Sequence, residues 1–365
     1  MRKLALFGGA CAGFVVVALG ACSDDPVDDD ALPPPSSAMS TSATGNGAGG
    51  DGGAGGDGGG GAGYVCQPGD ATTFALTELR FGTTQVGGWK KVGLNLDGLE
   101  TTSASTDVCQ PQAGGSASIA YPDGDNGIDN SFGKNLLPII LSILPTWGDE
   151  VNTQLTFGKF NAMLRVLCLP PTGDAPQLET FVFGGTDLGY PPLFNGQDEW
   201  PVVPELLSNM NDPLSSTLVF ENSSVTGQLF DSAPNEDFVL SIPIQIQDNA
   251  GALKLSLHSA RVMMTLSDDR KGATGGVIAG VLDTEEVIEQ ARKILWMADR
   301  CDDPDYDNYI LAIRQMSDIL VDGTQDPAQT CNGISFGVHF EMEEVQIGDV
   351  GPAAPADTLC AGLGP

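Results

Sequence analysis

The residues best suited to chemistry lie in one short acidic segment. Asp123, Asp125 and Asp129, with the amides of Asn126 and Asn130, place side-chain oxygens at close intervals over residues 123–130. Hard cations such as Ca²⁺ take six to eight oxygen ligands, and acids two residues apart on a turning loop direct several of them inward. The pattern therefore predicts a calcium site. The alternative is a polar turn shaped by Asx hydrogen bonds and glycine.

Neither acidic segment of this chain is an EF-hand. The 123–130 segment resembles the Asp- and Gly-rich calcium loops of secreted bacterial modules, but Lys134 stands where an EF-hand needs its bidentate glutamate. A second set of alternating acids is a further calcium candidate, and it has an arginine at that position. Its members are Asp303, Asp305 and Asp307. Asp307 is also suited to cap a following helix.

A nucleophilic serine has little support. Residues 333–337 read Gly-Ile-Ser-Phe-Gly, which matches the nucleophile-elbow pattern, and His339 lies nearby. That pattern needs a sharp turn from strand to helix, whereas the apolar alternation here continues to Met342 as one strand. Ser335 and His339 would stand ~13 Å apart on such a strand, beyond hydrogen-bond reach. A serine hydrolase is therefore not expected.

Carboxylate chemistry on carbohydrates remains an alternative. Glu341, Glu343 and Glu344 are the candidate acids, and glycoside cleavage needs two such groups facing each other ~5–10 Å apart. Trp200 lies in an Asp-Glu-Trp-Pro segment that suits either a sugar platform or a residue packed in the core. The sequence does not pair any two of these acids across a cleft.

Composition excludes one large class of function. The chain has 365 residues, a net charge of −32, 41% hydrophobic residues and two His. A nucleic-acid binder needs a basic face to displace counterions from phosphate, so that class is excluded. The apolar content is sufficient for a core. Two His leave little room for histidine-based metal or proton-transfer chemistry.

The amino-terminal segment 1–22 has the three parts of an export signal. Arg2 and Lys3 precede a short apolar stretch from Leu4 to Ala18, which is too short to span a ~30 Å bilayer. Residues 19–22 read Leu-Gly-Ala-Cys and resemble a bacterial lipobox, which implies cleavage after Ala21 and lipidation of Cys22. Cleavage after Gly20 is the alternative. Ser23 resembles the residue found in lipoproteins forwarded to the outer membrane.

Residues 22–63 are expected to form a tether. Aspartates and prolines come first, and glycine then makes up most of 45–63, interrupted only by Asn, Ala and Asp. Such a segment cannot bury enough apolar area to offset its ordering entropy. It should hold the body near a membrane and leave it free to reorient, with an average reach of ~35 Å. The folded body is then 64–365, as one domain or two sub-domains.

The body is acidic and rich in cysteine. Seven of the 48 acidic residues lie in 24–57 and two of the 16 basic residues in the signal, so 64–365 carries a balance of −27. That charge suits either a solvated surface or cation binding. Six cysteines in an exported chain predict three disulfides, with fifteen possible pairings. They are Cys66, Cys109, Cys168, Cys301, Cys331 and Cys360. Position suggests that Cys66 pairs with Cys360 and Cys301 with Cys331.

Hydrophobic periodicity predicts a mainly β fold. Apolar residues alternate with polar ones over 238–247, where Pro243 indicates an edge strand or a bulge. The alternation over 253–266 changes phase near Arg261, as a bulge would cause. Residues 334–342 alternate in the same way, and 153–169 suggests strands joined by a hairpin through Gly158.

Two helices are expected to interrupt the strands. One begins at Asp283, with Glu286 completing a capping pattern, and the other runs from about Asn308 to Leu320. Residues 135–144 are a third candidate. The apolar faces of all three are expected to belong to the core. Many short strands with turn-rich spacing favour a disulfide-linked β-sandwich with a two-helix insertion at 283–321.

Together these features predict a lipid-anchored envelope or cell-surface protein with a binding or structural role and calcium as a stabilising ion. Its partners would be the membrane, through the anchor, and a surface polysaccharide or another envelope protein. The alternatives are a carbohydrate-active envelope enzyme, which needs converging acids, and a carrier of hydrophobic ligands, which needs an apolar cavity. No catalytic residues are assigned, because catalysis is not favoured.

Overall fold

The structure is a computed structural model that describes residues 65–67, 69–82, 86–233, 236–246, 249–354 and 358–360. The expected signal, Cys22 and the tether lie outside these residues. The strands are β1 Ala71–Arg80, β2 Asn161–Leu167, β3 Ala175–Gly185, β4 Glu199–Val202, β5 Leu218–Thr226, β6 Leu229–Asp231, β7 Glu236–Ile246, β8 Asn249–Leu266, β9 Gly272–Asp283 and β10 Gly333–Val350. The helices are α1 Ala117–Ala120, α2 Leu137–Ile143, α3 Trp147–Thr156, α4 Thr284–Met297 and α5 Tyr306–Arg314.

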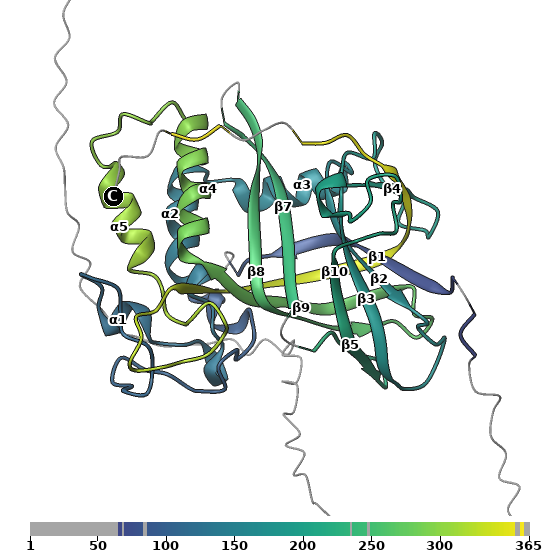
Figure 1. The fold of residues 1–365 in the computed structure, drawn as a ribbon, viewed down its shortest axis with the longest axis horizontal. Helices are drawn as coiled ribbons and strands as arrows, with labels where there is room; N and C mark the ends of the chain where they lie inside the picture. The colour runs from purple at the N-terminus through teal and green to yellow at the C-terminus, as the bar shows by residue number, and fades with distance from the viewer. Residues whose placement is uncertain are drawn as a thin grey trace, which may run out of the picture. The chain divides into compact units, whose positions relative to one another are not determined.

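Eight of the strands form one sheet that closes on itself. Pairing runs β1–β2–β3–β5–β6–β8–β9–β10 and returns from β10 to β1, and every one of these pairs is antiparallel. Strand β4 lies beside β3 and β10 at one end, and β7 pairs with the first half of β8. In Figure 1 the β7–β8 hairpin rises across β9 and β10, beside α4.

The core fills the space inside this sheet. Phenylalanines from four different strands are fully or almost fully buried in one hydrophobic cluster; they are Phe74, Phe220, Phe230 and Phe336. Opposite halves of the sheet therefore face each other across a shared core, as the two layers of a sandwich do. The prediction of a mainly β, disulfide-linked body with a helical insertion is confirmed, although its two facing layers belong to one continuous sheet.

Most of the local patterns predicted correct elements. Strand β7 is an edge strand that pairs only with β8 among the described strands, as Pro243 indicated. The register of β8 against β9 shifts between His258 and Arg261, where the phase change predicted a bulge. Asp283 caps α4, since its carboxylate accepts hydrogen bonds from the backbone N–H groups of Glu285 and Glu286.

The predicted hairpin through Gly158 is wrong. Residues 147–156 form α3, which buries Trp147, Val151 and Leu155 at a spacing of four residues. This spacing is the period of a helix, and the strand-like alternation was accidental. Gly158, at a φ of 67°, follows the end of α3, and β2 begins at Asn161.

All six cysteines of the body are paired, but not as position suggested. The disulfides join Cys66 to Cys168, Cys109 to Cys331, and Cys301 to Cys360. Cys66 precedes β1 and Cys168 follows β2, and these two strands are neighbours in the sheet. Proximity in the fold therefore determined the pairing, and proximity of the chain ends did not.

Candidate functional site

Three of the predicted calcium ligands, Asp123, Asp129 and Asn130, form hydrogen bonds between two loops. The Asp123 carboxylate accepts hydrogen bonds from the backbone N–H of Thr101 at 2.5 Å and from its hydroxyl at 2.7 Å. Asp129 accepts a bond from the N–H of Leu96 at 2.6 Å. Asn130 donates to the carbonyl of Val92 at 2.7 Å and accepts from the N–H of Gly133. These side chains bind the 92–101 segment to the 121–133 segment.

The remaining predicted ligands point elsewhere. Asp125 and Asn126 are exposed in a single 3₁₀ turn. Asp303 pairs with Arg300 and accepts a bond from the N–H of Asp305, while Asp307 is exposed in the first turn of α5. Among the described residues, no three His, Cys, Asp or Glu side chains are grouped so as to hold a metal ion.

Asp318 is, with Asp129, one of two buried acids of this region. Its carboxylate is buried and accepts hydrogen bonds from both the backbone N–H and the hydroxyl of Ser335, at 2.9 and 2.5 Å. Burial raises the pKa of Asp318 to about 7, although the two bonds from Ser335 favour the charged form. Burial, together with the neighbouring acids Asp97 and Asp123, also raises the pKa of Asp129 well above its usual value.

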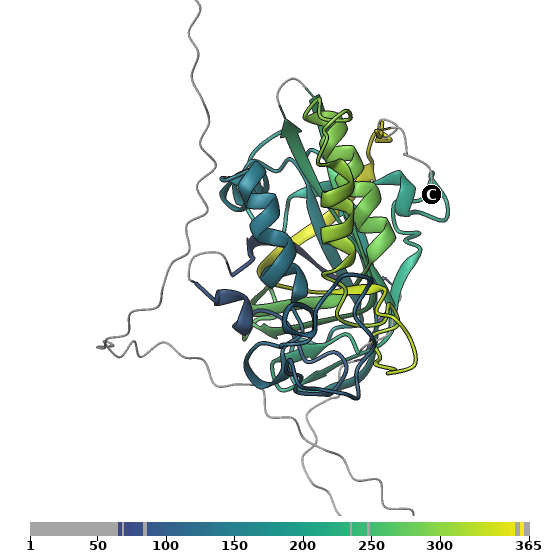
Figure 2. The same cartoon turned by 90° about the vertical axis from the view of Figure 1, so that its left-hand side faces the viewer.

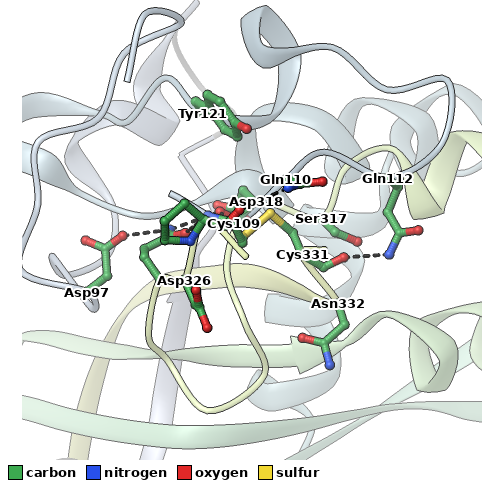
Figure 3. The surroundings of a disulfide bond; sticks show 12 residues. Asp97, Cys109, Gln110, Gln112, Tyr121, Ser317, Asp318, Asp326, Cys331 and Asn332 are labelled. Carbon is green, nitrogen blue, oxygen red and sulfur yellow. Dashed lines mark hydrogen bonds between the residues drawn. A yellow bond between two sulfur atoms is a disulfide. The ribbon is translucent and has the colours of Figure 1, made fainter. Parts of the chain in front are cut away.

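A buried disulfide lies beside Asp318 (Figure 3). Cys109 and Cys331 are both fully buried, and the side chain of Gln112 donates to the carbonyl of Cys331. Gln325 accepts a bond from the N–H of Cys109 at 2.9 Å and donates to Asp97 at 2.8 Å. The disulfide and this amide join the 97–112 segment to the 318–331 segment, which were distant in the sequence.

Three of the residues considered for catalysis, Ser335, Glu341 and Glu344, are engaged in structural contacts. The Ser335 hydroxyl donates to Asp318, and burial lowers the pKa of His339. Glu341 pairs with Arg80 at 2.6 Å, and Glu344 pairs with Lys271 at 3.1 Å. Burial, and to a lesser extent nearby acids, raises the pKa of Glu343.

Trp200 is a core residue. Its ring is completely buried, and its Nε1–H donates to the carbonyl of Thr186 at 2.8 Å. It packs in a smaller hydrophobic cluster with Phe183, Val202 and Val345. The sugar-platform interpretation of this residue therefore has no exposed ring to support it.

A polar groove lies between the loops and the bulge of β8. It has a volume of about 620 Å³, and three leucines line it together with amide, hydroxyl and charged side chains. Many of these polar groups already have partners: Asn95 bonds to Leu99 and Gly98, Asp97 to Gln325, and Arg261 to Asp231. The groove is a polar surface feature whose side chains mainly hydrogen-bond to one another and to neighbouring residues.

A second cavity has the opposite chemistry. It lies under the helices, has a volume of about 80 Å³, and is lined by fourteen residues of which Gln290 and Tyr309 are the only ones with a polar side-chain group. The others are Phe132, Leu136, Ile139, Ile140, Leu144, Leu253, Leu255, Val287, Ala291, Ile294, Leu295 and Ile313. The sequence predicted the apolar faces of these helices but assigned all of them to the filled core.

Comparison with protein-family models, with curated proteins and with solved structures finds no match for this chain. Within the part of the chain that the structure describes, every helix is too short or too polar to cross a membrane.

Proposed function

We propose that this protein is an exported lipoprotein that holds a binding body at the cell envelope. The proposal joins the export signal and lipobox ending at Cys22 to the tether of 22–63 and the β-rich body beyond it. Acyl chains on one cysteine contribute ~0.8 kcal/mol per buried CH₂, and several chains on one residue make attachment durable. The membrane is then the first partner, and the tether allows the body to reach others.

The disulfides are the observation that carries this proposal. All six cysteines of the body pair, across sequence separations of 102, 222 and 59 residues. Disulfides of this kind form and persist in oxidising compartments and are rare in the cytosol. The covalent framework therefore supports export, on evidence independent of the amino-terminal signal.

The polar groove and the apolar cavity described above favour a binding role over catalysis. Side chains of one hydrophobic cluster fill the inside of the sheet, and the described residues also line a polar groove of about 620 Å³ and an apolar cavity of about 80 Å³. The polar groove suits a hydrated partner such as a surface polysaccharide or another envelope protein. The apolar cavity gives specific support to the second candidate, a protein that binds a hydrophobic ligand.

Membrane fractionation of a bacterial host tests the anchor. The full chain should be recovered with membranes, and Cys22→Ser should release the body into the soluble extracytoplasmic fraction. Cys11→Ser is the matched control, because it makes the same change in the segment expected to be removed. Membrane recovery that is equal for wild type and Cys22→Ser would contradict the proposal.

Calcium stabilisation through 123–130 stays a prediction of the sequence. Asp123 and Asp129 would have to give up the hydrogen bonds described above or use their other lone pairs. Thermal unfolding of the full chain with EDTA and with millimolar calcium tests it, since a ligand that binds only the folded state raises its stability. An upward shift that Asp125→Ala removes would support a site there, and equal midpoints would exclude millimolar affinity.

A further inference from the structure

The apolar cavity is built where α4 covers an open strand edge. The first half of β8 pairs with β7 on one side and has no β9 partner on the other, since β9 pairing begins at Leu257. Helix α4 takes that place, with Gln290 accepting a bond from the N–H of Lys254 and Lys293 donating to the carbonyl of Ala252. The edge is thereby protected, and the apolar face of α4 lies next to Leu253 and Leu255.

Two further helices complete the walls. Helix α2 contributes Ile139 and Ile140, with Leu144 just after its end, and α5 contributes Tyr309 and Ile313. Figures 1 and 2 show α2 close to α4, and α5 packed along α4. Because α2 and α4 come from opposite halves of the chain, the cavity exists only once both halves of the body have folded.

The two polar side chains of the cavity lining already have hydrogen-bond partners, so the lining holds water poorly. Gln290, the most polar lining side chain, uses its oxygen on the backbone of β8, and the hydroxyl of Tyr309 accepts a bond from Arg300 at 3.1 Å. Cavities with only apolar walls remain dry and bind apolar molecules, whereas a stable internal water needs two to four polar partners. Several wall residues, including Ile139, Ile140 and Ile294, are still only half-buried. An apolar occupant would complete their burial.

We propose that this cavity binds the end of one alkyl chain, supplied by a single-chain amphiphile whose head is uncharged or cationic. The inference deepens the binding role proposed above and rests on it. A volume of about 80 Å³ admits a narrow chain end, but it is too small for the row of side chains that a helix or a second copy would insert.

Charge around the cavity selects the head. The segment 284–314, which carries α4 and α5, contains eight acidic and four basic residues. Its two ion pairs, Arg300 with Asp303 and Arg314 with Glu285, use one acid for each base, so the net charge of the segment remains −4. An anionic head would therefore meet net repulsion at this surface, and an ammonium or hydroxyl head would not.

The test is calorimetric binding of 1-alkanols of four to ten carbons to the purified full chain in detergent-free buffer. Affinity should rise about fourfold for each added methylene until the chain fills the cavity, and then stay level. Octylammonium should bind at least as well as 1-octanol, and octanoate more weakly at neutral pH. No measurable binding, or affinity that rises without a plateau, would overturn the proposal.

Two variants distinguish the cavity from the general surface. Ile294→Ala enlarges the cavity and should move the plateau to longer chains, whereas Leu311→Ala, on the exposed side of α5, should leave it unchanged. Ala291→Phe should abolish binding by filling the space. A plateau that Ile294→Ala does not move would overturn the site. Because the anchor test depends on Cys22 alone, failure here would leave the lipoprotein proposal standing.

Discussion

At the scale of single residues, Asp123, Asp129 and Asp318 accept hydrogen bonds from backbone N–H groups of other segments. The sequence predicted Asp123 and Asp129 to be calcium ligands, which stays a prediction, and in the structure both accept hydrogen bonds from backbone N–H groups. Their partners, Thr101 and Leu96, lie in a separate loop of the chain, so no local pattern could identify them. Asp318 carried no motif, and its burial beside Ser335 follows only from the tertiary fold.

The raised pKa of Asp318 makes stability depend on pH in a defined direction. The folded-state value is about 7 against a usual 3.8, so the folded protein holds this proton where the unfolded chain has lost it. Its contribution to stability is present below pH 4 and is lost as pH rises to 7, by at most ~1.4 kcal/mol per pH unit. We expect the unfolding free energy of Asp318→Asn, measured by denaturant titration, to lack this decrease between pH 4 and 7.

Asp125→Asn is the control for that experiment, because it removes the same charge from an exposed turn. Between pH 4 and 7, its unfolding free energy should change with pH as that of the wild type does. If Asp318→Asn also follows wild type, Asp318 does not hold its proton in the folded state.

At the scale of elements, the patterns that depend on neighbouring residues predicted well. The period of two placed β7, β8 and β10, and the capping residue placed the start of α4. The failure at α3 came from a short amphipathic helix whose ten residues also alternate over part of their length. The cavity could not be predicted, because the packing of α2 against α4 and β8 decides whether apolar faces meet without gaps.

One arginine ties together three turns at one end of the sheet. Arg270, between β8 and β9, is buried and donates from Nη2 to the carbonyls of Gly173 and Gly227, which lie in the β2–β3 and β5–β6 turns. Its φ of 58° is unfavourable for a residue with a side chain, and these contacts compensate for it. Arg270→Ala should lower the unfolding free energy by about 2–4 kcal/mol in guanidinium titrations.

The adjacent Lys271 provides the comparison. It is exposed and pairs with Glu344 at the surface, so Lys271→Ala should cost no more than about 1 kcal/mol. Equal losses for the two variants would mean that Arg270 does not join the turns.

At the scale of the whole molecule, a closed sheet and three disulfides give a body whose distant segments are covalently joined. The composition predicted a disulfide-linked β protein, whereas closure of the sheet and the cysteine pairing depend on contacts between strands far apart in the chain. The disulfides also differ in how far their cysteines are exposed to solvent. Cys66 is exposed, but Cys109 and Cys331 have no exposed surface.

Access should set the order of reduction under native conditions, because a thiolate must reach a sulfur to attack it. With a mild thiol reductant, Cys66–Cys168 should open before Cys109–Cys331, and the latter should require unfolding. Timed alkylation followed by peptide mapping gives the order. Simultaneous labelling of both pairs in the folded protein would contradict this expectation.

The mass of the mature amino-terminal peptide shows whether a lipid on Cys22 holds this body at the envelope. The protein would be expressed in a bacterial host, extracted with detergent and digested. We expect a peptide that begins at Cys22 and carries the added mass of acyl chains. An unmodified peptide beginning at Ala21, as cleavage after Gly20 would give, would contradict it.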